Sequence, residues 1–158
     1  MEKGFITVTS ASDYTVVVNV PTVQLHRVWR KRGSHYPIDR ETMYQAYYDP
    51  SVEYLFQKGL LTTDDKEFLV AVGLADEEGA TEVIPLTDAL INRILKLMPM
   101  SDVKETLKKL SPIQIDELAD YAVEHYKDLS MDRIDLLSKA SGKKLMKAIE
   151  LYKAGQEG

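Results

Sequence analysis

The first third of the chain carries the apolar pattern of β-strands. Residues 5–9 and 14–20 are rich in β-branched and aromatic side chains, and the turn-like residues 10–13 separate them. We therefore expect these two segments to pair as a hairpin. Residues 23–30 predict a third strand, and a loop over residues 32–35 follows it. In that third strand one face collects three apolar side chains, Val23, Leu25 and Trp29.

Helical spacing replaces this pattern from Asp39 onward. Asp39 is placed to cap a short helix that carries Met43, Ala46 and Tyr47 and ends before Pro50. The apolar spacing of residues 52–58 predicts a second helix that Gly59 ends. Thr63 or Asp64 is expected to open a third helix that runs to residue 72. The middle of the chain therefore adds short helices to the predicted strands.

The last third is helical throughout, and serines divide it. A run with helical apolar spacing follows each of four of them, which we expect to be helix caps: Ser101, Ser111, Ser130 and Ser141. The strongest local signal is at Ser111, because Pro112 and Gln114 follow it. A serine N-cap with proline at the first helical position and glutamine at the third is a capping box.

Together these patterns predict an α+β fold. A small N-terminal antiparallel sheet with short helices precedes a C-terminal bundle of short helices. The acidic, glycine-containing stretch 75–81 indicates an exposed linker, so we place the boundary between a strand-rich part, residues 1–80, and a helical bundle, residues 81–158. A chain of 158 residues suits one domain, or one domain with an appendage.

The charge is unevenly spread along the chain. The net charge is −5, yet residues 24–40 hold five Arg and Lys side chains against one Asp, while residues 62–88 are strongly acidic. Such a dipolar layout favours docking onto protein surfaces, including copies of the same chain, over general attraction to nucleic acid.

No pattern indicates catalysis or a metal site. The chain has no cysteine, which excludes disulfides, thiolate metal sites and cysteine catalysis. His26, His35 and His125 lack the paired spacing of metal ligands, and no serine lies in a nucleophile turn. We therefore expect a protein that is not an enzyme and has no cofactor, metal or catalytic residue.

The location expected for the protein is the cytoplasm. No apolar run approaches the roughly 20 residues of a membrane helix. The first residues lead directly into strand-like sequence, so we expect no secretory signal and no membrane partner.

The basic segment 26–40 and the nearby tyrosines are the sharpest functional feature. Arginine, tryptophan and tyrosine are the usual anchors of protein interfaces. The predicted partner-binding residues are Arg27, Trp29, Arg30, Lys31, Arg32, Tyr36, Arg40, Tyr47 and Tyr48.

Other interpretations of the basic residues remain open. The segment also suits a solvated hairpin end with a core tryptophan, and its arginines and aromatics suit phosphate contact with base stacking. The last helices could in addition form a helix-turn-helix, in which Lys143, Lys144 and Lys147 would face phosphates.

Four segments give the chain a resemblance to small proteins of tailed bacteriophages. They are residues 16–21, with Val-Val-Val-Asn-Val-Pro; residues 27–33, with an Arg, Trp and Gly pattern; residues 49–56; and the closing Ser-Gly-Lys-Lys-Leu-Met-Lys-Ala-Ile-Glu-Leu of residues 141–151. The resemblance implies a virion or assembly component and transfers no binding residue.

The sequence thus predicts a structural or assembly protein that docks onto a larger protein complex. By the resemblance, that complex is a phage capsid, neck or tail, and the protein would move from the host cytoplasm into the virion. The alternative is a nucleic-acid-binding or transcription-regulatory protein that uses residues 26–40.

Overall fold

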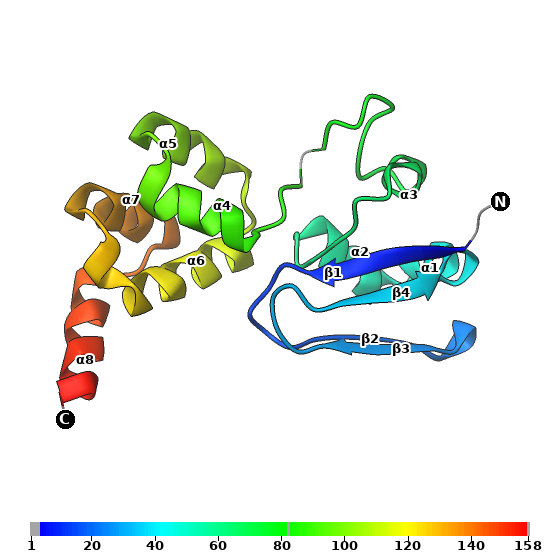
Figure 1. Ribbon diagram of the computed structural model, residues 1–158, viewed down its shortest axis with the longest axis horizontal. Coiled ribbons are helices and arrows are strands. Elements are labelled where there is room, and N and C mark those ends of the chain that lie inside the picture. Colours follow the sequence, from blue (N-terminus) through cyan, green and yellow to red (C-terminus); the bar gives the residue numbers. More distant parts are fainter. Residues whose placement is uncertain (1–3, 82, 158) are drawn as a thin grey trace. The chain divides into compact units, whose positions relative to one another are not determined.

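The computed structural model describes residues 4–81 and 83–157. They form two compact units, Met1–Thr87 and Asp88–Gly158. The first unit holds the strands and the second is helical (Figure 1), so the predicted α+β class is confirmed. Residues 1–3, on which the expectation about a secretory signal rests in part, lie outside the described residues.

The strands of the first unit form two antiparallel sheets (Figure 1). Strand β1 (Phe5–Ser10) lies between β4 (His35–Asp39) and the short β5 (Leu61–Thr62), while β2 (Val16–Val20) pairs with β3 (Leu25–Trp29). The predicted hairpin of the first two strands is therefore wrong.

Two features of the chain redirect the pairing of β1. The connection 11–15 is not a tight turn, because Ser10 and Ser12 bond to each other and the Ala11 N–H donates to Leu60. A 3₁₀ turn at Pro21–Val23, with Gln24 in the left-handed region at φ 56°, joins β2 to β3 instead. The predicted loop at residues 32–35 is followed by β4, whose backbone pairs with all of β1 up to Thr9.

Three helices complete the first unit: α1 (Arg40–Tyr47), α2 (Pro50–Gln57) and α3 (Lys66–Ala71). All three match predicted helices, and each is capped by an aspartate: Asp39, Asp49 and Asp65. Helix α3 thus begins after Asp65 and not at the expected Thr63 or Asp64. One core joins them to both sheets, with Trp29, Tyr47, Phe56 and Phe68 among its largest buried side chains.

The acidic stretch 75–81 is an ordered loop. Ala75 and Thr81 form an antiparallel bridge, and the Asp76 carboxylate accepts hydrogen bonds from the N–H groups of Glu78 and Ala80, each at 2.9 Å. The chain stays with the first unit up to Thr87, because the Arg32 guanidinium donates to the Leu86 carbonyl.

The second unit contains α4 (Asp88–Asn92), a π-helical turn (Arg93–Leu97), α5 (Met100–Lys109), α6 (Pro112–Glu124), a 3₁₀ turn (Tyr126–Asp128), α7 (Met131–Ser141) and α8 (Leu145–Glu157). Helix α6 packs against both α7 and α8, and α5 packs against α7. Buried side chains from these helices include Ile94, Leu107, Leu118, Leu137 and Ile149.

Two of the four predicted serine caps are confirmed. Ser111 forms the complete capping box with Gln114, and the Ser130 hydroxyl accepts from the Arg133 N–H. Ser101 is not a cap, because α5 already begins at Met100 after Pro99. Ser141 is the last residue of α7, and Gly142 in the left-handed region ends that helix.

Candidate interaction surfaces

The structure buries the two aromatic residues that would have been the strongest interface anchors. Trp29 is fully buried, and its indole N–H donates to the Val8 carbonyl at 3.0 Å. Tyr47 is 1% exposed and packs edge-on against Phe56 and Phe68. Burial raises the pKa of the Tyr47 hydroxyl. As contact residues for a partner, both are corrected to core residues, because no partner can reach their side chains in the folded unit.

Tyr36 is held from within the unit. Its hydroxyl donates to the Val28 carbonyl at 2.8 Å, and its ring packs edge-on against Trp29. Both contacts fix β4 against β3, so the partly buried ring supports the sheet packing rather than forming an open platform.

Arg32 is a structural arginine. Its guanidinium donates to the Ala11 carbonyl at 2.7 Å and to the Leu86 carbonyl, and it pairs with Asp13 at 3.1 Å. Its side chain is only 6% exposed. These bonds join three distant segments of the first unit, which explains why the charge of Arg32 is turned inward.

Arg40 is also engaged within the unit. It forms two bonds with the Asp65 carboxylate, the shorter at 2.5 Å, and a third with Glu67 at 3.1 Å. The hydrogen bonds from Arg40 lower the pKa of Asp65, and the same pairing raises the pKa of Arg40. Because Asp65 caps α3, this pair fixes the start of α3 to the start of α1.

The other predicted contact residues remain at the surface. Arg30 and Lys31 are exposed in the loop between β3 and β4, Arg27 is half-buried and donates to the neighbouring His26 carbonyl, and Tyr48 is 65% exposed. The predicted interface is therefore reduced to a short basic loop tip and a tyrosine at the end of α1.

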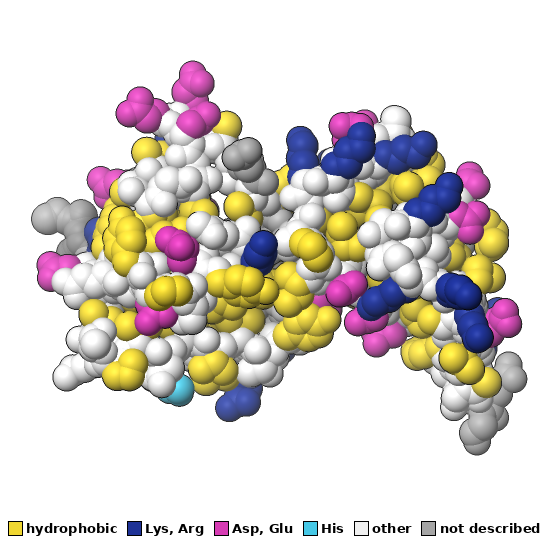
Figure 2. All heavy atoms as spheres, turned by 180° about the vertical axis from the view of Figure 1, so that it is seen from behind, with side chains coloured by type: hydrophobic (Ala, Val, Ile, Leu, Met, Phe, Trp, Pro, Cys, Tyr) yellow, Lys and Arg dark blue, Asp and Glu magenta, His cyan; other side chains and the backbone are white. Residues whose placement is uncertain are grey.

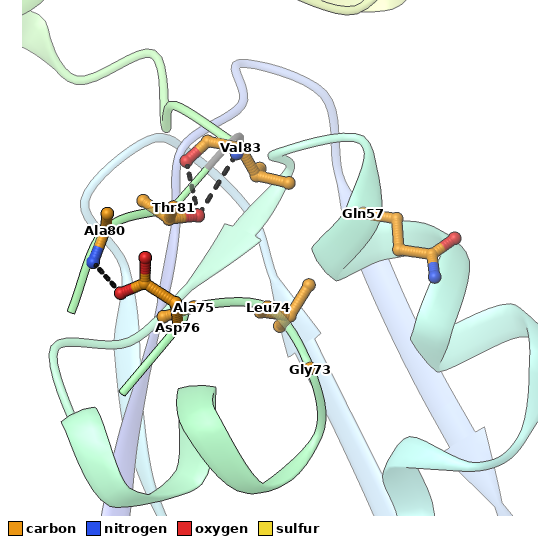
Figure 3. Close-up of a pocket in the computed structure, with 8 residues that line it drawn as sticks. All are labelled: Gln57, Gly73, Leu74, Ala75, Asp76, Ala80, Thr81 and Val83. Carbon is orange, nitrogen blue, oxygen red and sulfur yellow. Dashed lines mark hydrogen bonds between the residues drawn. The ribbon is translucent and has the colours of Figure 1, made fainter. Parts of the chain in front are cut away.

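A pocket of about 530 Å³ lies between α2 and the acidic loop (Figure 3). The side chains of Asp76 and Thr81, which line it, are turned to their own backbone: Asp76 accepts from Ala80, and the Thr81 hydroxyl bonds the backbone of Val83. These bonds shape the loop that forms one side of the pocket.

The helical unit carries an apolar groove that the sequence analysis missed. It has a volume of about 430 Å³ and is formed by α5, α6 and α7. Its lining has four apolar side chains, Leu107, Ile115, Leu136 and Ala140, and three lysines, Lys104, Lys108 and Lys139. We call these seven residues the lysine-rimmed groove. Figure 2 shows Lys and Arg side chains over α5 with hydrophobic side chains exposed beside them.

Helical spacing explains how the groove is built. Lys104, Leu107 and Lys108 are three and four residues apart, so they share one face of α5. Leu136, Lys139 and Ala140 repeat this arrangement on α7. A signal was therefore present in the sequence, but a lysine next to an apolar stripe is also the ordinary border of a buried helix face.

The lysines assigned to a helix-turn-helix have a different environment. The Lys143 ammonium lies 3.7 Å from Asp116 and 3.6 Å from Asp120, both on α6. These carboxylates oppose the approach of a phosphate to Lys143, whereas Lys144 and Lys147 are exposed.

The described part of the chain contains no group of three or more His, Asp or Glu side chains arranged to hold a metal ion. Within the same residues, no helix is long and apolar enough to cross a membrane. No protein-family model, curated protein or solved structure matches this chain.

Proposed function

We propose that this protein is a non-enzymatic docking protein that binds a partner protein within a larger assembly through the lysine-rimmed groove. One observation carries the proposal: partly exposed apolar side chains, Ile115 and Leu136, lie in a groove that three helices hold in place. A concave apolar surface on a fixed scaffold is a common form of protein-binding site.

The assembly role extends the resemblance to small phage proteins, so a virion or its assembly intermediate is the complex proposed. The basic loop tip, Arg30 and Lys31, would then border the contact or remain in solvent. Nucleic-acid binding through that tip is the competing function, and the experiment below separates the two.

A photo-crosslinking amino acid placed at Ala140 tests the docking role in the cells that naturally make this protein. Ala140 is exposed at the edge of the groove, so the replacement leaves the core intact. The same amino acid at Arg30 reports on the basic tip, and at Ala154 on α8 it serves as the control.

We expect a discrete protein adduct from position 140 that resists nuclease and is absent from position 154. Adducts formed only at position 30 and removed by nuclease would establish the nucleic-acid function in place of docking. The absence of a protein adduct at position 140 would refute docking through the groove.

A further inference from the structure

The chemistry of the lysine-rimmed groove specifies its occupant. We infer that the groove binds an amphipathic helix whose apolar face is flanked by Asp and Glu, supplied by a partner protein. This inference rests on the proposed docking function and adds the class of segment that is recognised.

The lysines of the rim make few contacts with carboxylates in the described part of the chain. Neither Lys104 nor Lys139 has a carboxylate partner among the described residues, and Lys108 pairs only with Glu105, at 3.2 Å. Both side chains of that pair are more than two-thirds exposed, at 73% and 68%, so the bond exchanges readily with another carboxylate. Three ammonium groups around one apolar floor therefore complement a ligand that is acidic at its edges.

The two walls of the groove indicate a helical ligand. Each wall is a helix that presents a leucine to the floor and a lysine to the rim: Leu107 with Lys108 on α5, and Leu136 with Lys139 on α7. An amphipathic ligand helix has a matching arrangement: an apolar stripe at i, i+3 or i+4, and i+7, with polar residues on both sides of the stripe. Placed in the groove, it would bury its stripe against the floor and set acidic side chains against lysines from both walls.

Other ligands fit the groove less well. The lining residues include no aromatic ring for base stacking and no arginine, both of which nucleic-acid sites commonly use. An acyl chain with a carboxylate would satisfy one lysine but leave the lysines of the other wall without a partner.

Selection from a library of random 16-residue peptides displayed on phage tests the inference on the full chain. The library is first depleted on the Leu136→Asp variant, so that peptides binding elsewhere are removed. We expect the enriched peptides to combine apolar residues at i, i+3 or i+4, and i+7 with Asp or Glu beside them. Enrichment of basic, uncharged or non-helical sequences would overturn the inference, as would the absence of peptides that distinguish the two proteins.

Charge-reversal variants then test the rim with the best selected peptide in fluorescence anisotropy. Lys104→Glu and Lys139→Glu should each weaken binding about tenfold. Lys109→Glu is the matched control, because Lys109 is exposed on α5 but does not line the groove. Equal affinities for all three variants would contradict a role for the rim. Oleate added as competitor should not displace the peptide; displacement by oleate alone at low concentration would instead assign the groove to an acyl ligand.

These outcomes separate the inference from the proposed function. A nuclease-resistant protein adduct at position 140, together with selected peptides that lack acidic residues, would keep the docking function and remove the acidic helix. Circular dichroism spectra that match the wild type establish that each variant remains folded.

Discussion

Two arginines of the first unit and two lysines of the second unit have opposite environments. In the first unit, Arg32 and Arg40 bond to carbonyls and carboxylates of their own unit. In the second unit, Lys104 and Lys139 lie beside an apolar groove and have no carboxylate partner within the described part of the chain. The guanidinium group, with five donors in a plane, suits internal bonds to several acceptors. Arginines that are close together in the sequence can thus hold the fold together, and lysines that are far apart in the sequence can form an accessible surface.

In the second unit, Arg133 is likewise bonded to carbonyls of its own unit. Arg133 donates to the Ile94 carbonyl at 2.6 Å and to the Met98 carbonyl at 2.5 Å, and so caps the end of the π-helical turn. These carbonyls lie at a helix end and lack the full set of helical partners. The internal bonding of these arginines therefore reflects the chemistry of the guanidinium group as much as the type of secondary structure around it.

The largest expected effect is that of removing Trp29. Trp29→Ala should destabilise the protein by about 3–5 kcal/mol, because it leaves a cavity in the core and removes the indole hydrogen bond to the Val8 carbonyl. Urea denaturation followed by circular dichroism measures the loss, since Trp29 is the only tryptophan in the chain. A variant as stable as the wild type would return Trp29 to the list of surface contacts.

Arg32 and Arg30 form a matched pair two residues apart. Arg32→Ala should cost roughly 1–3 kcal/mol, because the Ala11 and Leu86 carbonyls lose a charged donor. Arg30→Ala should change stability by less than about 0.5 kcal/mol, because Arg30 is exposed. Thermal and urea unfolding of both variants measures the two losses of stability. Equal losses would show that Arg32 contributes no more to the fold than the exposed Arg30.

Ser111 and Ser101 provide the corresponding pair in the helical unit. Ser111→Ala should destabilise by about 1 kcal/mol, since it removes the capping box of α6. Ser101→Ala should have almost no effect, because Ser101 lies inside α5. The urea midpoints of the two variants measure both effects. A larger loss of stability in Ser101→Ala than in Ser111→Ala would contradict the start of α5 at Met100.

The smallest expected effect is a pH dependence of the stability, which comes from the Arg40–Asp65 ion pair. Arg40 lowers the pKa of Asp65, so the pair stabilises the fold fully above the unfolded-state pKa of about 3.9 and loses its contribution as the pH falls through the lower folded-state value. Asp65→Asn keeps the α3 cap but removes the charge.

The deficit of Asp65→Asn relative to the wild type should therefore be present at pH 7 and shrink below about pH 4. Urea midpoints measured over this range test it. A deficit that stays constant with pH would show that the ion pair with Arg40 does not stabilise the fold.

The fold was predictable where the determinants are local. The Asp39 cap of α1 and the capping box at Ser111 act within one helical turn and were expected from the sequence. The Asp49 cap of α2 was not predicted, and Asp65 caps α3 in place of the expected Thr63 or Asp64. The pairing of β1 with β4 was not predictable in this way, because it depends on contacts between segments about thirty residues apart.

The candidate site was harder to predict for a related reason. The apolar face that includes Leu25 and Trp29 could be assigned from alternation, but the internal partners of Arg32 include Leu86, which is distant in sequence. The lysine-rimmed groove combines residues of three helices, so no single segment carries its pattern.

The most direct test of the account is lysine footprinting of the full chain with the selected acidic peptide or the crosslinked partner. Acetylation rates are measured by mass spectrometry with and without the bound ligand. We expect protection of Lys104, Lys108 and Lys139, with unchanged rates at Lys31 in the basic tip and at Lys109 outside the groove. Protection of Lys31 while the three groove lysines stay reactive would contradict it and place the contact on the first unit.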